Sequence, residues 1–267
     1  MGGKRIWISV DKTQDSCRRY VANVVIGTME FDKPSQIFLL AYEQLDKTNS
    51  STVAQLFTSA LNLLWPDGVK YEDVLLFTSD VAPYMKKAAK ALKILFPNLL
   101  HVTCLAHALH RICEEIRGIF SEVDSLISNT KKIFLKSPTR IQLFKEMAPE
   151  LALPPQPVLT RWGTWLSAAL YYASNFNKIQ TIVNELCDDD ASSIAVVEKL
   201  MLKGTVRNDL AFIAANYSAL PDSIKCLEER NKSLVNSLDV VDDIVTGVTG
   251  NIVEEKCEQV LKHSENF

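Results

Sequence analysis

Two aspartates, Asp11 and Asp80, each follow a short apolar run of the sequence. Residues 5–10 and 73–79 are rich in β-branched and other apolar side chains, which predicts a strand in each place. If these strands are parallel neighbours, both carboxylates emerge at the carboxyl edge of one sheet, where α/β proteins bind ligands. Adjacent carboxylates repel each other unless a cation neutralises them, so the pair predicts a site for Mg²⁺ or Mn²⁺.

Divalent cations held in this way support one particular chemistry, the cleavage of phosphodiester bonds by metal-activated water. Asp15 lies four residues after Asp11 and is a spare carboxylate. Each aspartate of the pair also has a purely structural interpretation. Asp80 stands shortly before Pro83, as the N-cap of a helix does, and Asp11 suits a strand end or a turn.

A cysteine and a histidine, Cys104 and His107, are three residues apart and share one face of a predicted helix. A closed zinc site needs four ligands. The next cysteine, Cys113, lies roughly half a turn around the same helix, so it does not complete such a site. The spacing therefore favours a packed or hydrogen-bonded pair over zinc.

Two further groups are candidates for contact with DNA. Arg161 can bridge phosphate oxygens, and Trp162 offers a ring on which an unpaired base can stack. The alternative is that Trp162 and Trp165 are core aromatics, with Thr160 as a helix cap. A second group is a stripe of lysines that either contacts the DNA backbone or stays solvated, and it consists of Lys86, Lys90 and Lys93.

The composition is that of a globular protein: 267 residues, of which 47% are hydrophobic. There is no apolar run of about 18 residues and no signal-peptide pattern, so we expect a soluble intracellular protein without a membrane partner. The six cysteines are scattered along the chain, which favours reduced thiols. The net charge is −3, but residues 81–145 hold eleven Lys/Arg and four Asp/Glu, a local balance of +7. This segment either meets phosphate or is a set of solvated helices.

The hydrophobic periodicity predicts the elements that position these residues. Strands are expected at residues 5–10, 20–29, 36–43, 73–79 and 99–103, with helices at 53–64, after Pro83 and from 104. The order β-β-β-α-β-α-β-α is that of an RNase H-like mixed sheet, an α/β fold. Beyond residue 119 the pattern is mostly helical, at 121–136, 138–147, 160–180, 192–203 and in amphipathic pieces to the end. The proline-rich stretch at 154–157 predicts a boundary between a core portion, 1–150, and a helical portion, 151–267.

Four blocks of the sequence, taken in order, resemble the hAT transposase superfamily, in particular the hAT-derived branch related to CGG-repeat-binding proteins. The blocks are residues 10–15 with the strand at 19–24, residues 78–85, the Cys104/His107 pair, and residues 160–165. The resemblance covers about residues 5–180. It implies that Asp11 and Asp80 are the first two acids of a DDE triad, with Cys104 and His107 beside the active site and Trp162 near the DNA.

The sequence also departs from this family. In the family, the catalytic glutamate follows a long insertion domain and precedes a dimerisation region, and the chain ends before either would fit. Glu254 and Glu255 are the nearest candidates by order. A BED-type zinc finger is also missing, and the oligomeric state stays open.

We therefore expect a transposon-derived, domesticated protein of the nucleus that binds DNA and cleaves it weakly or not at all. One alternative is an active Mg²⁺-dependent transposase or nuclease, with Glu254 or Glu255 as its third acid. The other is a non-catalytic module for protein interactions, in which Asp11 and Asp80 serve as turn and cap.

Overall fold

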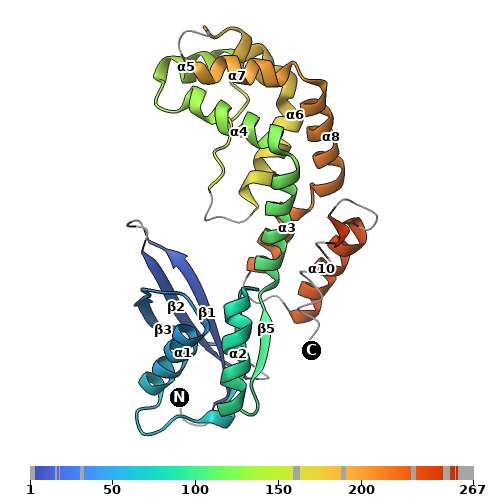
Figure 1. The fold of residues 1–267 in the computed structure, drawn as a ribbon. Coiled ribbons are helices and arrows are strands. Elements are labelled where there is room, and N and C mark those ends of the chain that lie inside the picture. Colours follow the sequence, from blue (N-terminus) through green and yellow to red (C-terminus); the bar gives the residue numbers. More distant parts are fainter. Residues whose placement is uncertain are drawn as a thin grey trace. The chain divides into compact units, whose positions relative to one another are not determined.

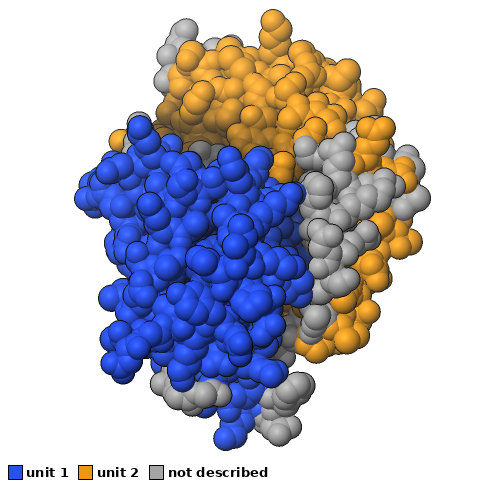
Figure 2. Space-filling model, turned by 60° about the horizontal axis from the view of Figure 1, so that its bottom comes forward, with its two compact units in different colours: residues 1–108, 260–267 blue, residues 109–259 orange. Residues whose placement is uncertain are grey.

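The structure is a computed structural model with two compact units, Met1–Ala108 and Leu109–Gln259 (Figure 2). It describes residues 4–15, 17, 19–30, 33–158, 163–187, 191–229, 233–248, 253–255 and 257. The proline-rich stretch at 154–157 lies inside the second unit. The basic segment 81–145 is shared between the units, so its lysines and arginines do not all belong to one folded body.

The first unit contains a five-stranded mixed sheet with the strand order β3-β2-β1-β4-β5 (Figure 1). β1 pairs antiparallel with β2 and parallel with β4; β2 and β3 are antiparallel, and β4 and β5 are parallel. The elements are β1 (Ile6–Gln14), β2 (Tyr20–Thr28), β3 (Ile37–Gln44), α1 (Ser50–Leu64), a short 3-10 turn (Tyr71–Asp73), β4 (Val74–Ser79), α2 (Pro83–Leu95), β5 (Leu100–Thr103) and the start of α3 (Leu105–Ile119). The predicted RNase H-like order is confirmed.

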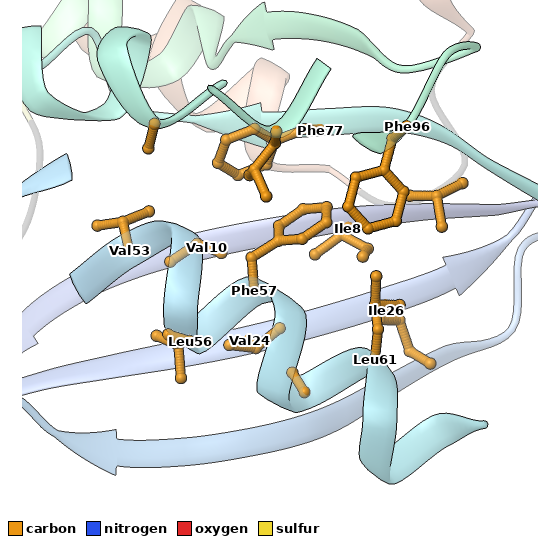
Figure 3. Close-up of a cluster of buried hydrophobic side chains, with 14 of the residues drawn as sticks. Ile8, Val10, Val24, Ile26, Val53, Leu56, Phe57, Leu61, Phe77 and Phe96 are labelled. Carbon is orange, nitrogen blue, oxygen red and sulfur yellow. The ribbon is translucent and has the colours of Figure 1, made fainter. Parts of the chain in front are cut away.

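α1 and α2 cover one face of this sheet, and the hydrophobic core lies between these helices and the sheet (Figure 3). Residues on alternate positions of β1, such as Ile8 and Val10, are buried against the helices, as expected for a strand with one covered face. Phe57 of α1 lies at the centre of the core. Its ring makes edge-on contacts with Phe77 of β4 at 5.1 Å and with Phe96 at 5.4 Å between centroids.

The first strand is longer than its sequence indicates. Residues 11–15 have turn chemistry, and a strand end was predicted before them. Instead β1 continues to Gln14, because Asp11 to Gln14 pair with residues 20–23 of β2 in a long hairpin. The hydrogen bonds of this ladder outweigh the local preference for a turn, and Asp11 is therefore a residue within a strand.

The second unit is helical. It comprises the rest of α3, then α4 (Ser121–Phe134), α5 (Pro138–Met147), α6 (Thr164–Asn184), α7 (Ser192–Met201), α8 (Gly204–Tyr217), α9 (Leu220–Glu228) and α10 (Leu234–Val248). The helix predicted from residue 160 begins at Thr164, after Gly163, whose φ of 69° is left-handed and suits glycine. Throughout the described parts of the chain, no helix is long and apolar enough to cross a membrane.

Candidate cation site

The register of the sheet places Asp11 and Asp80 at equivalent positions. β1 and β4 run parallel, and the last pair of this ladder is Ser9 with Thr78. Asp11 and Asp80 each lie two residues beyond that pair. Because side chains two residues apart in a strand share a face, Asp11 lies on the same sheet face as Ser9, opposite the buried Ile8 and Val10. The structure thus brings the two predicted acids close together just beyond the end of the parallel β1–β4 ladder, with Asp11 inside β1 and Asp80 directly after β4.

The charges of this site act on one another. Partial burial raises the pKa of Asp11 above its ordinary 3.8, and the negative charge of Asp80 raises it further, while His107 acts in the opposite direction. The Nε2 of His107 lies 3.6 Å from Oδ1 of Asp11. Burial and Asp80 therefore destabilise the ionised form of Asp11, and a positive charge nearby would compensate for this effect.

Asp80 also has a local structural role, although it is not the N-cap of α2. The N-cap is Ala82, with Pro83 in the first turn and no side-chain capping bond. The Oδ1 of Asp80 instead accepts a hydrogen bond from the backbone N–H of Ala82 at 2.9 Å. Such a bond to the residue two positions on forms an Asx turn, which leaves the second carboxylate oxygen for other partners.

Cys104 and His107 form a hydrogen-bonded pair at the start of α3. Burial alone would raise the pKa of the Cys104 thiol, but hydrogen bonds from His107 and from the backbone of Ala106 hold it below its ordinary value. Burial alone would lower the pKa of His107, yet the bond to Cys104 and the charges of Cys104, Asp11 and Asp80 raise it. Contacts within the pair therefore stabilise the ionised form of each side chain, and His107 lies beside the carboxylate of Asp11.

Two histidines of this unit, His107 and His101, are expected to have pKa values shifted in opposite directions. His107 should lose its proton above the ordinary 6.5, because anionic neighbours hold it, whereas burial and the charge of Lys86 lower the pKa of His101 to about 4. NMR titration of the imidazole Cε1–H signals, assigned with His107→Gln and His101→Gln, measures both. Asp11→Asn should lower the His107 value, and Asp67→Asn, on an exposed turn, should leave it unchanged. A His107 that titrates below 6.5 would contradict this electrostatic description.

Tyr84 is a neighbour of the carboxylates that sequence reasoning did not single out. Burial and the charges of Asp80 and Asp11 raise the pKa of its phenol to about 12, so it stays a hydrogen-bond donor at neutral pH. The Nζ of Lys12 lies 4.5 Å from the Tyr20 ring centroid and 6.0 Å from that of Tyr84. The signal in the sequence was the position of Tyr84, one residue into the helix that follows Asp80.

The carboxylate of Asp15 forms hydrogen bonds within the connection between β1 and β2. Its carboxylate accepts hydrogen bonds from the backbone N–H groups of Cys17 and Arg19 and from Nε of Arg19 at 2.7 Å. Hydrogen bonds from Arg19 hold the pKa of Asp15 below its ordinary range. It therefore closes a turn, and the expectation of a spare carboxylate is wrong.

The other predicted residues belong to different parts of the chain. The lysine stripe lies on α2, in the first unit. Arg161, Trp162 and the capping residue Thr160 fall outside the described residues, whereas Trp165 is a core aromatic with 4% of its surface exposed. Its Nε1 donates to Oδ1 of Asp124 at 2.9 Å. The remaining acids, Glu254 and Glu255, lie in the second unit, and their role as a third acid stays a prediction.

The carboxylate pair fits a hard divalent cation in the type of its donors but provides few of them. Oxygen ligands suit Mg²⁺ and Mn²⁺, and Mg²⁺ is commonly held by one or two carboxylates together with water and substrate phosphates. Among the described residues, no group of three or more His, Cys, Asp or Glu side chains is arranged to hold a metal ion. Asp11 and Asp80 would hold the cation, with water or phosphate oxygens as its other ligands.

A comparison with known families places the sheet and this site in one domain. Residues 1–133 match the family model described as a domain of unknown function, DUF659. This domain family is found in hAT-type transposase-like proteins. The matched segment contains the whole sheet, both aspartates and the Cys104/His107 pair. No curated protein matches the chain.

Proposed function

We propose that the chain is a transposon-derived, hAT-like transposase segment, of the branch related to CGG-repeat-binding proteins, that binds DNA in the nucleus and cleaves it weakly or not at all. The equivalent register of Asp11 and Asp80 is the observation that carries the proposal. The match of residues 1–133 to a domain of transposase-like proteins supports it independently.

The residues of the site have separate roles in this proposal. Asp11 and Asp80 hold Mg²⁺ or Mn²⁺, which when bound supplies charge neutralisation for a phosphate group. Tyr84 stays protonated and can donate a hydrogen bond at the same place. His107 lies against Asp11, and in its protonated form it offsets part of the carboxylate repulsion when the cation is absent.

We expect weak cleavage because the part of the chain that the structure describes provides two carboxylates and no larger group of metal ligands. Two-metal sites fix two ions about 4 Å apart so that both the attacking and the leaving oxygen are stabilised. A pair of carboxylates, one of which already accepts a bond from Ala82, holds a single ion loosely. Arg161 and Trp162 remain candidates for DNA contact, as does the lysine stripe of α2.

A nicking assay tests the proposal. With supercoiled plasmid and millimolar Mg²⁺ or Mn²⁺, we expect the chain to retard the DNA in a gel but to convert little or none of it to the nicked form. Metal-dependent nicking of most of the plasmid, which Asp11→Asn abolishes and the control Asp67→Asn retains, would instead identify an active nuclease or transposase. A chain that neither binds nor nicks DNA would favour the protein-interaction module.

A further inference from the structure

A groove of about 460 Å³ runs between α2 and β5 in the first unit. It lies along the edge of the sheet, because β5 is the last strand and pairs only with β4. Its principal lining residues are Lys86, Lys90, Lys93, Leu99, His101 and Thr103.

The lysines line the groove because of the helical period of α2. Met85, Ala88, Ala89 and Leu92 are the buried residues of this helix and fix its inner face. The three lysines recur at intervals of four and three residues, so they form one row along its flank. Lys87 is also exposed, but it lies about 100° around the helix from Lys86 and is not part of the lining.

The groove is positively charged. Its described lining contains three lysines and no aspartate or glutamate. Among the residues that the structure describes, Lys90 and Lys93 form no ion pair. The pKa of His101 is lowered to about 4 by burial and by the charge of Lys86, against the opposing charge of Asp80, so the imidazole is neutral at physiological pH.

Polar side chains of β5 line the groove opposite the lysines. The Nε2 of His101 lies 2.9 Å from Oγ of Ser79, and its ring lies 5.0 Å from that of Phe77. Thr103 has a nearly buried side chain at the end of β5. The groove therefore combines ammonium groups on one wall with uncharged polar side chains on the other, and the ammonium groups suit phosphate oxygens.

We propose that this groove binds successive backbone phosphates of a nucleic-acid strand. Lys86 and Lys93 are separated by roughly 10 Å along the helix axis, enough for two or three phosphates of one strand. Lysines attract phosphate without reading bases, so binding here is independent of sequence. The inference rests on the proposed function for the nature of the partner and adds the place and the mode of contact.

Fluorescence anisotropy with a labelled single-stranded oligonucleotide tests the proposal, in EDTA so that no cation at Asp11 and Asp80 contributes. Lys90→Gln and Lys93→Gln are each expected to weaken binding about fivefold at low salt. Each should also reduce the slope of log affinity against log salt by about 0.7. Lys87→Gln, on the same helix but outside the groove, is the matched control and should change the affinity by less than about twofold.

The outcomes distinguish binding in the groove from nonspecific electrostatic attraction, and they distinguish failure of this proposal from failure of the proposed function. Equal losses in Lys87→Gln and Lys90→Gln, or no loss in either, would overturn the groove as the binding place. The cation site is then still tested by Mn²⁺ binding, which does not involve these lysines. An absence of oligonucleotide binding would overturn both the groove and the DNA-binding part of the function.

A second readout distinguishes a strand from a small phosphate compound. The oligonucleotide should shift the His101 imidazole NMR signal at micromolar concentration, and Lys90→Gln should weaken this effect. Inorganic phosphate should need concentrations at least about a hundredfold higher, because it lacks the linked charges of a strand. Saturation of the His101 shift by inorganic phosphate at equal concentration would overturn a strand as the ligand.

Discussion

Replacing Phe57 by alanine is expected to lower the free energy of unfolding of the first unit by about 3–5 kcal/mol. The side chain is fully buried, and its ring contacts those of Phe77 and Phe96, which come from β4 and from the end of α2. Its removal leaves a cavity where helix and sheet meet, and the neighbouring rings close that cavity only in part. Hydrogen exchange of peptides from β1 and β4, followed across a urea series, reports on this unit specifically.

The same helix offers a matched control for this prediction. Leu63 of α1 is 64% exposed, so Leu63→Ala should change the stability by less than about 0.5 kcal/mol. Similar losses for Phe57→Ala and Leu63→Ala would mean that the core does not lie between α1 and the sheet. The carboxylate site depends on this core, because the core fixes the neighbouring strands β1 and β4.

The affinity for Mn²⁺ is expected to fall about tenfold for each unit of pH once the pH is below the pKa of Asp11. A proton competes with the cation for this carboxylate, and burial together with Asp80 raises its pKa above 3.8. The loss should therefore begin at a higher pH than for an exposed aspartate. Calorimetric titrations at several pH values measure it, and an affinity that is constant through the acidic range would contradict the assignment of Asp11.

The raised pKa of Asp11 also predicts how the stability of the cation-free chain depends on pH. A carboxyl whose folded pKa is raised contributes stability below its unfolded pKa, and this contribution is lost as the pH rises through the folded pKa. At neutral pH the ionised Asp11 therefore disfavours folding. Asp11→Asn should melt at the same temperature as the unchanged chain or higher at pH 7, in EDTA, and a clearly lower melting temperature would point to a structural role.

The sequence predicted those features of the fold that depend on local periodicity. The apolar spacing from Val53 to Leu64 indicated α1, and the run at 73–79 indicated β4, because helix and strand bury side chains at different intervals. The mixed order of strands and helices then limited the topology to a few arrangements. Asp11 and Asp80 as neighbours followed from that topology.

Other features depend on pairing that no local pattern encodes. The turn-forming residues after Val10 did not indicate that β1 continues to Gln14, because these residues are held in the strand by their pairing with β2. The alignment of Asp80 with Asp11 depends on a register shift between β1 and β4 after Ile6, which changes the pairing partner of every residue that follows. Tyr84 and His101 likewise became visible only when the packing placed them beside other groups.

Binding of Mn²⁺ by the carboxylate pair is the central claim, and an electron paramagnetic resonance titration tests it most directly. At neutral pH we expect one Mn²⁺ per chain, with affinity reduced at least about tenfold by either Asp11→Asn or Asp80→Asn. Asparagine at position 80 keeps the oxygen that accepts from Ala82, so the turn is preserved. Asp67→Asn, in the exposed connection that leads to β4, should bind as the unchanged chain does. Equal Mn²⁺ affinity in all four proteins would contradict the shared cation site.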